Sequence, residues 1–243
     1  VAIAQGSSER NISFVVDREN EQKAMNTLHD AFFLAGVKSV NLFVVGVGLI
    51  GGRLLEMLAE QKKNLFDDYQ IEINLKGIAN SNRMLVREDS VSLNTWKGEL
   101  LEKGSPMELD RFAEEVKKLN LPNSIFVDCT ASSEIQRIYP EFLRKSISVV
   151  TPNKLANSSN QEQFDELQKI AFRHNCAYRY ETNVGAGLPL IGTMHELVTT
   201  GDHVDRIESV LSGTVSYIIN KEKGDMPFSD IVKKAMEKIY TEH

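Results

Sequence analysis

Residues 40–52 read VNLFVVGVGLIGG, an apolar run that ends in a cluster of glycines. Gly46, Gly48 and Gly51 fit the spacing G-x-G-x-x-G. The apolar run predicts a strand that is covered on both faces, and residues 50–61 predict a helix. A glycine-rich turn between a buried strand and a helix is typical of proteins that bind a dinucleotide.

Each glycine has its own physical role in such a turn. Gly46 permits the tight turn, Gly48 lets the backbone approach a pyrophosphate, and Gly51 lets the helix pack closely against the strand. The helix start at Leu49 and Ile50 offers free N–H groups and a partial positive charge to phosphates. We therefore predict that NADP or NAD binds at this turn.

Strands and helices alternate along the residues that follow. Strands are expected at 71–79, 124–129 and 147–151, and helices at 110–119 and 134–145. This alternation predicts an α/β fold with a Rossmann-type, doubly wound parallel sheet over residues 39–154.

The two flanking parts of the chain have a different order. Over residues 155–243 we expect helices near 161–174, 188–199 and 228–238 and strands near 177–181 and 206–211. This order predicts a second, α+β substrate or dimerisation domain, truncated at its C-terminus. Residues 1–38 contain one expected strand and one expected helix, too little for an independent core. We interpret them as the remnant of another domain and a linker.

Composition limits the classes of partner. The chain of 243 residues has a formal net charge of −6, with 42% hydrophobic and 26% charged residues. This balance argues against nucleic acid or an anionic membrane as the main partner. No apolar run is long enough to span a membrane, and no leader peptide is evident, so we expect a cytoplasmic protein. Cys129 and Cys176 lie in expected buried strands and are interpreted as inert thiols.

Further cofactor contacts are expected at the carboxyl ends of the other parallel strands. The second strand ends without an acidic residue, and Asn80 and Arg83 follow it. This slightly favours NADP, because Arg83 can meet a 2′-phosphate. Alternatively, Arg83 is a solvated loop cation. Thr130 and Ser132 can line the nicotinamide ribose, although a serine there can also cap the next helix. Lys154 leaves the sheet at the expected cleft.

Six motifs in order resemble homoserine dehydrogenases and cover residues 40–220. They are VVGVGLIGG, GIANS, DCTAS, VVTPNK, YETNVGAGLPLI and LSGTVSYI. In addition, IAQGSSERNISFVVD and the helix after it resemble the end of an aspartokinase regulatory (ACT) domain. That pairing is similar to the bifunctional aspartokinase–homoserine dehydrogenases.

The resemblance implies a reaction and several site residues. The reaction is reduction of L-aspartate 4-semialdehyde to L-homoserine by NADPH or NADH, in threonine and methionine biosynthesis. Lys154 would stabilise negative charge on the aldehyde oxygen, unless it is a phosphate-neutralising or surface lysine. Gly213, Thr214 and Glu242 match substrate-binding positions.

The resemblance also implies a monovalent cation, sodium, bound by Glu181 and by the carbonyls of Val184, Ala186 and Leu188. Oxygen ligands suit a hard cation. From the residues alone, this stretch is a loop that precedes a helix opened by a proline.

Other expectations concern activity and assembly. The family's principal catalytic lysine lies downstream of position 243, so residues 1–243 alone are expected to have little or no turnover. The family suggests a homo-oligomer and a feedback amino acid. Two alternatives are another Rossmann oxidoreductase and a regulatory or nucleotide-binding module without catalysis; the motifs TPNK and NVGAG would distinguish the first.

Overall fold

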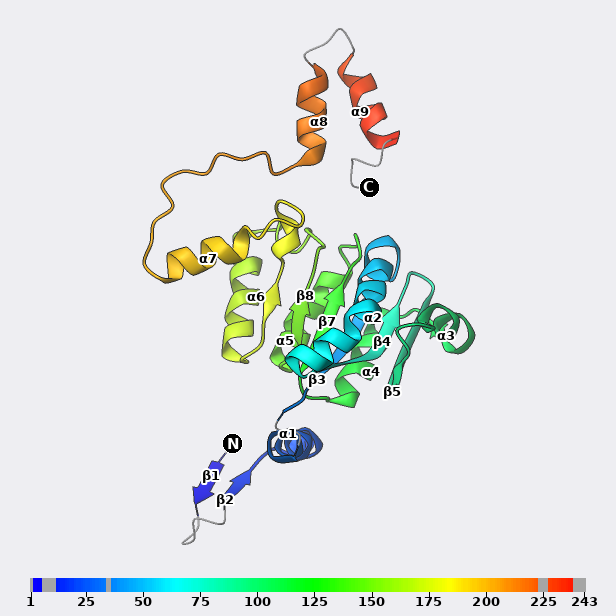
Figure 1. The fold of residues 1–243 in the computed structure, drawn as a ribbon, viewed down its shortest axis with the longest axis vertical. Coiled ribbons are helices and arrows are strands. Elements are labelled where there is room, and N and C mark those ends of the chain that lie inside the picture. Colours follow the sequence, from blue (N-terminus) through cyan, green and yellow to red (C-terminus); the bar gives the residue numbers. More distant parts are fainter. Residues whose placement is uncertain (1, 6–11, 34–35, 223–226, 238–243) are drawn as a thin grey trace.

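A computed structural model describes residues 2–5, 12–33, 36–222 and 227–237. Its main feature is a sheet of seven described strands in the order β6-β5-β4-β3-β7-β8-β9 (Figure 1). These strands are β3 (Lys38–Val45), β4 (Ile71–Ala79), β5 (Arg83–Val91), β6 (Ser105–Pro106), β7 (Ser124–Asp128), β8 (Ser148–Val150) and β9 (Tyr178–Arg179).

The centre of this sheet is parallel, as the apolar strand pattern predicts. Strand β3 pairs in parallel with β4 on one side and with β7 on the other, and β7, β8 and β9 continue in parallel. Strands β5 and β6 are antiparallel additions beside β4 that the sequence reasoning missed. The Rossmann-type α/β fold is confirmed, with a mixed rather than a wholly parallel sheet.

Helices cover both faces of the sheet. One layer contains α2 (Leu49–Tyr69) and α3 (Trp96–Lys103), and the other contains α4 (Leu109–Leu119), α5 (Tyr139–Arg144) and α6 (Gln161–Arg173). Each layer buries its own apolar cluster, because side chains of a strand alternate between the two faces of the sheet. Phe43 belongs to the cluster on the α4 and α5 side, and its neighbour Val44 belongs to the cluster on the α2 side.

The remaining described elements are short or lie toward the two ends of the chain. They are β1 (Ala2–Gln5), β2 (Ile12–Val15), α1 (Glu21–Phe33), α7 (Ile191–Thr199), α8 (Gly213–Glu222), α9 (Phe228–Glu237) and the 3-10 turns Arg18–Asn20, Ile135–Ile138 and Glu181–Asn183. Strands β1 and β2 form a separate antiparallel pair. None of the helices in the described ranges combines the length and the apolar character that crossing a membrane requires.

The strand expected at residues 206–211 is wrong. This segment is irregular, and its apolar residues Ile207 and Val210 are 59% and 77% exposed. A strand needs a neighbour for its N–H and C=O groups, and no described strand lies beside this segment. Strand β9, in contrast, joins the main sheet although it lies beyond residue 154; the domain boundary there stays a prediction.

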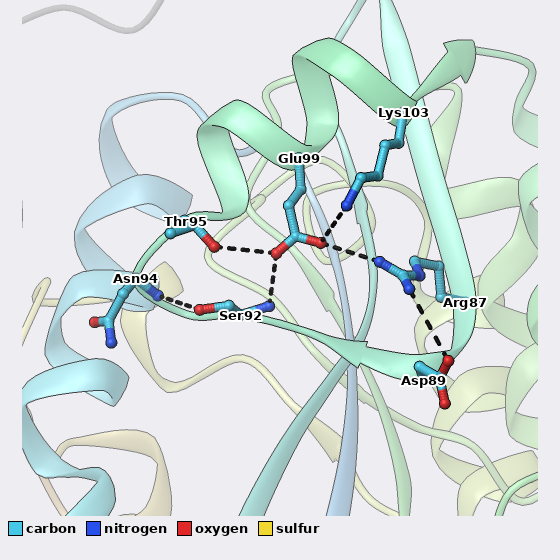
Figure 2. Close-up of polar contacts among 7 residues, drawn as sticks. All are labelled: Arg87, Asp89, Ser92, Asn94, Thr95, Glu99 and Lys103. Carbon is cyan, nitrogen blue, oxygen red and sulfur yellow. Dashed lines mark hydrogen bonds and ion pairs between the residues drawn. The ribbon is translucent and has the colours of Figure 1, made fainter.

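Glu99 on α3 fastens that helix to strand β5 (Figure 2). Its carboxylate accepts hydrogen bonds from the Ser92 backbone N–H (3.1 Å) and the Thr95 hydroxyl (3.1 Å), and it pairs with Arg87 (3.0 Å). The Ser92 bond, with Thr95 and the cations Lys103 and Arg87, holds the pKa of Glu99 below its ordinary value. The ionised form of Glu99 therefore stabilises the fold.

Glu99→Gln is expected to lower the free energy of unfolding at pH 7 by about 1 kcal/mol, because it removes the charge from this cluster. A lowered folded-state pKa stabilises above the unfolded value of about 4.3 and stops doing so as the pH falls through the folded value. The difference between wild type and variant should thus vanish at low pH in urea unfolding. Glu102→Gln, at an exposed position of the same helix, is the control; an equal loss there would contradict the prediction.

Candidate dinucleotide-binding site

The glycine turn between β3 and α2 is built as the motif predicts. Gly46 has φ +87°, a left-handed conformation that favours glycine, and its N–H donates to the Ala79 carbonyl (2.8 Å) at the end of β4. A Cβ on Gly46 would lie 2.7 Å from the Cys129 carbonyl carbon and 2.8 Å from Thr130 Cγ2. The turn is therefore pressed between the ends of β4 and β7.

Gly51 and Gly48 differ in what surrounds them. A Cβ on Gly51 would lie 2.3 Å from the Gly46 carbonyl oxygen, so helix and turn are in close contact. A Cβ on Gly48 would meet no described atom within 4 Å. The protein itself does not require glycine at position 48 for space. Open space in front of this backbone suits a ligand that approaches it closely.

The start of α2 is suited to an anion. Gly48 is the N-cap and supplies no side-chain acceptor, and the first turn of this described helix contains no acidic residue. Leu49 and Ile50 follow, 89% and 58% exposed. The first N–H groups of a helix have no partner within the helix, and they carry the positive end of its dipole. The residues present therefore fit the pyrophosphate of a dinucleotide.

The crevice for the rest of such a ligand lies where the strand order reverses. The chain leaves β3 toward β4 on one side, and β7 returns on the other side, so Val45 lies between Ala79 and Asp128. Ligands of open α/β sheets bind outside the carboxyl ends of the strands at this point. A cavity of about 730 Å³ opens here.

Several predicted site residues meet in this cavity. Ile50 from α2, Thr130 after β7, Lys154 after β8, and Glu181 and Ala186 after β9 all line it. Gly48, Leu49 and Ile50 also line a groove of about 610 Å³ on the outer side of α2. Arg179 on β9 lines the cavity too, and the sequence reasoning did not single it out.

Asn80 and Arg83 have structural partners at the β4–β5 turn. The Asn80 side-chain oxygen accepts from the backbone N–H groups of Asn82 (2.9 Å) and Arg83 (2.8 Å). Arg83 Nη1 donates to the Gly104 carbonyl (3.0 Å). Since Ala79 anchors the glycine turn, this hairpin lies beside it. A role of either side chain toward an adenosine 2′-phosphate stays a prediction.

A buried polar network at the ends of β7 and β8 was missed by the sequence reasoning. Asp128 is 0% exposed and accepts from Tyr139 Oη (2.5 Å), Asn153 Nδ2 (3.0 Å) and the Thr130 N–H (2.8 Å). Thr151 donates its hydroxyl to the Asp128 carbonyl (3.0 Å). Three of these donors point at one carboxylate, so the loops after two adjacent strands are tied together.

Two pKa shifts describe this region. Burial, together with the charge of Asp128, raises the pKa of Tyr139 far above its ordinary value, so Tyr139 remains a hydrogen-bond donor. Burial, and again Asp128, raises the pKa of Cys129 to about 11. The Cys129 thiol is consequently protonated at neutral pH. The expectation that Cys129 and Cys176 lie in buried strands is wrong, because both are only partly buried and lie just outside the strands.

Glu181 caps helix α7. Its two carboxylate oxygens accept from the backbone N–H groups of Ile191 (2.8 Å) and Gly192 (2.8 Å). A carboxylate at a helix N-terminus satisfies free donors and opposes the helix dipole. Nearby, Asn183 Nδ2 donates to the Thr151 carbonyl (3.1 Å), which joins this loop to the end of β8.

Glu181→Gln is expected to accelerate hydrogen exchange at the Ile191 and Gly192 amides by about fivefold, because a carboxylate cap contributes about 1 kcal/mol. Exchange followed by NMR checks the result. Glu196→Gln, at an exposed position of the same helix, is the matched control and should leave both amides unchanged. Equal exchange rates in the Glu181 variant and wild type would show that the cap does not hold α7.

The remaining predicted site residues belong to the expected cation loop and to the expected substrate site. The Leu188 carbonyl accepts from the Leu190 N–H (2.9 Å), and Ala186 has φ +52°. A cation bound by Glu181, Val184, Ala186 and Leu188 stays a prediction, as do the substrate roles of Gly213 and Thr214, which lie at the start of α8 and do not line the described cavity. Glu242 lies outside the described residues.

The sheet order, the glycine turn and the open helix start define an NAD(P)-binding α/β protein of the Rossmann type. The family description "Homoserine dehydrogenase, NAD binding domain" matches residues 46–181, "Homoserine dehydrogenase" matches residues 189–243, and "ACT domain" matches residues 1–32. The chain belongs to the homoserine dehydrogenase family, in agreement with the resemblance of its motifs.

Individual relatives agree with this membership. The chain is 41% identical to a chloroplastic bifunctional aspartokinase/homoserine dehydrogenase of Arabidopsis thaliana, over 99% of this chain and 26% of the relative. It is 40% identical to the bifunctional enzyme of Haemophilus influenzae, over 100% of this chain and 29% of the relative. It thus spans less than a third of either protein. A hyperthermophilic archaeal homoserine dehydrogenase solved with NADPH superposes with a TM-score of 0.69 at 25% identity, over 85% of this chain and 63% of that one.

Proposed function

We propose that this chain binds NADP or NAD and contributes it to the reduction of L-aspartate 4-semialdehyde to L-homoserine. The observation that carries the proposal is the glycine turn, where the backbone at Gly48 faces open space at the start of an uncapped helix. The bound nicotinamide would supply the hydride. Names of similar proteins support the substrate and the fusion to an aspartokinase.

The chain's own residues have distinct proposed roles. The N–H groups at the start of α2, at Leu49 and Ile50, hold the pyrophosphate. Thr130 and Ser132 contact the nicotinamide half. The Lys154 ammonium stabilises negative charge that develops on the aldehyde oxygen, which is most effective in a cavity with apolar walls. The walls near Lys154 include Val127, Val150 and Pro152, in line with this role.

The resemblance and the composition carry further proposals. They concern sodium at the Glu181 loop, a homo-oligomer, a feedback amino acid, a cytoplasmic location and the division at residue 154. The cation proposal draws on Glu181 and the glycine-rich loop after it, and the division draws on the different order of strands and helices expected after residue 154. The two family matches meet further along the chain, between residues 181 and 189.

The proposal is tested by NADPH binding to the chain and to Gly48→Ala. Trp96 is the only tryptophan of the chain, and its ring lies 3.7 Å from the position of a Cβ on Gly52, so energy transfer from Trp96 to NADPH reports on this site. The added methyl group would occupy the space that the pyrophosphate needs. We expect NADPH affinity to fall about tenfold or more, roughly 1.4 kcal/mol.

The melting temperature separates this effect from damage to the fold. Because a Cβ on Gly48 meets no described atom within 4 Å, Gly48→Ala should cost at most about 1 kcal/mol of stability, the preference of a helix N-cap for glycine over alanine. Gly98→Ala, which likewise adds a methyl group in open space but on α3, should keep both NADPH affinity and stability. Unchanged NADPH affinity in Gly48→Ala, or no NADPH binding to wild type, would overturn the proposal.

A further inference from the structure

Asn153 joins two loops of the cavity through a buried amide. It lies directly before Lys154 and is 4% exposed. Its Nδ2 donates to Asp128 Oδ2 (3.0 Å) and to the Ser132 carbonyl (3.0 Å). Its Oδ1 accepts from the Leu155 N–H (3.1 Å), and its own N–H donates to Thr151 Oγ1 (2.9 Å). One side chain therefore contacts the loop after β7 and the loop after β8.

The geometry points to Asn153 as a positioning residue for the nicotinamide half of the cofactor: it fixes the loop that carries Lys154 against the loop that carries Thr130 and Ser132. This inference rests on the proposed function, because it assigns a task within the same dinucleotide site. The side-chain amide of Asn153 is engaged within the protein, so it acts through its neighbours.

The hydrogen bonds of Asn153 fix the orientation of its side-chain amide. A carboxamide offers two N–H donors and one oxygen acceptor, and each kind of group has a partner here. The partner Asp128 carries a charge and is itself held by Tyr139 and Thr130, so the bond between Asn153 and Asp128 is a strong one. Movement of either loop would break a hydrogen bond of a buried group, and a buried group that loses its partner costs free energy.

The position of Asn153 separates its task from the rest of the site. Its bonds join the ends of β7 and β8, whereas the pyrophosphate turn lies at the end of β3 and the Asn80 hairpin follows β4. Within the described part of the chain, the hydrogen bonds of its side chain go to neither that turn nor that hairpin. A change at Asn153 should therefore act on the nicotinamide half of the ligand and leave the adenosine half alone.

Two ligands that differ by the nicotinamide and its ribose test this separation. NADP⁺ and adenosine 2′-phosphate 5′-diphosphate (2′-phospho-ADP) share the adenosine, the 2′-phosphate and the pyrophosphate. Isothermal titration of the chain with each ligand gives the ratio of their affinities. For Asn153→Ala we expect NADP⁺ to bind about tenfold more weakly, and 2′-phospho-ADP to bind within about twofold of wild type, because only contacts near the misplaced loops are lost.

A purely structural role predicts a different result, because damage to the fold weakens both ligands together. Equal losses for NADP⁺ and 2′-phospho-ADP, or no loss for either, would overturn the inference while the dinucleotide site stands. Failure of wild type to bind either ligand would overturn the proposed function and this inference with it.

Matched variants complete the experiment. Asn64→Ala removes an exposed amide in the middle of α2 and should leave both affinities unchanged. Asn153→Ser places a hydroxyl group at the buried position. This group has one hydrogen and cannot donate to two acceptors at once, so the variant should show the same selective loss in a milder form. If Asn153→Ala does not fold, Asn153→Ser carries the test with the same two ligands and the same criteria.

Discussion

Gly51→Ala is expected to abolish dinucleotide binding and to lower the free energy of unfolding by about 3 kcal/mol. The added Cβ would lie 2.3 Å from the Gly46 carbonyl oxygen and 3.1 Å from its carbonyl carbon, both backbone atoms. A flexible side chain can move away from such a contact, but a turn anchored on Ala79 cannot do so without losing its own hydrogen bonds. The start of α2 must then shift away from β3.

The neighbouring glycine provides the control for this prediction. A Cβ on Gly52 would lie 3.7 Å from Trp96 Cζ2 and 4.0 Å from the Val47 carbonyl oxygen, which are ordinary contacts. Gly52→Ala should keep NADPH binding and can gain up to about 1 kcal/mol from helix propensity. Thermal unfolding and NADPH titration of both variants decide the matter. Equal losses of stability and of NADPH affinity in Gly51→Ala and Gly52→Ala would contradict the close packing of Gly51 on the turn.

The contrast among the three glycines of the motif shows what its spacing can predict. From the sequence alone, the tight turn, the ligand approach and the helix contact are separate predicted tasks for Gly46, Gly48 and Gly51. The structure assigns a positive φ to Gly46 and a backbone contact to Gly51. Such local geometry is predictable because the residues that create it lie within six positions of one another.

Pairings between distant segments were harder to predict. Strand β5 contains four charged residues among nine, RMLVREDSV, and lies toward one side of the sheet, so its pattern does not resemble that of a strand covered on both faces. Conversely, residues 206–211, RIESVL, contain the β-branched residues Ile207 and Val210 that strands favour, but the segment has no described strand as a partner. In both cases the outcome depends on which neighbour is available, and local periodicity carries no such information.

The polar network around Asp128 illustrates the same limit within the site. Its bonds to Tyr139 and Asn153 join residues 11 and 25 positions apart, on helix α5 and on the loop after β8, which meet Asp128 only in the folded protein. One signal was present in the sequence: SIFVD places an acidic residue at the end of a buried apolar strand. A buried carboxylate requires several donors, so that residue predicts a network without identifying its members.

Asp128→Ala is expected to lower the free energy of unfolding by about 3–5 kcal/mol, the other large effect in this chain. Removal of the carboxylate leaves the Tyr139 hydroxyl, the Thr130 N–H and one N–H of Asn153 without their acceptor. Each buried donor that loses its partner costs about 1–3 kcal/mol, and the losses are not fully additive because the cavity can admit water. Urea unfolding at pH 7 measures the total.

Tyr139→Phe distinguishes loss of the network from loss of packing. It removes one donor to Asp128 and keeps the ring, which packs edge-on against Phe126 at 6.2 Å between centroids. We expect a cost of about 1.5–3 kcal/mol, the range for a hydrogen bond to a charged group. In the double variant the combined cost should fall short of the sum of the two single costs by about 1 kcal/mol or more, because both substitutions delete the same bond. Strict additivity would mean that the hydrogen bond between Tyr139 and Asp128 contributes no net stability, and the cost of Asp128→Ala would then come from its other bonds and from packing.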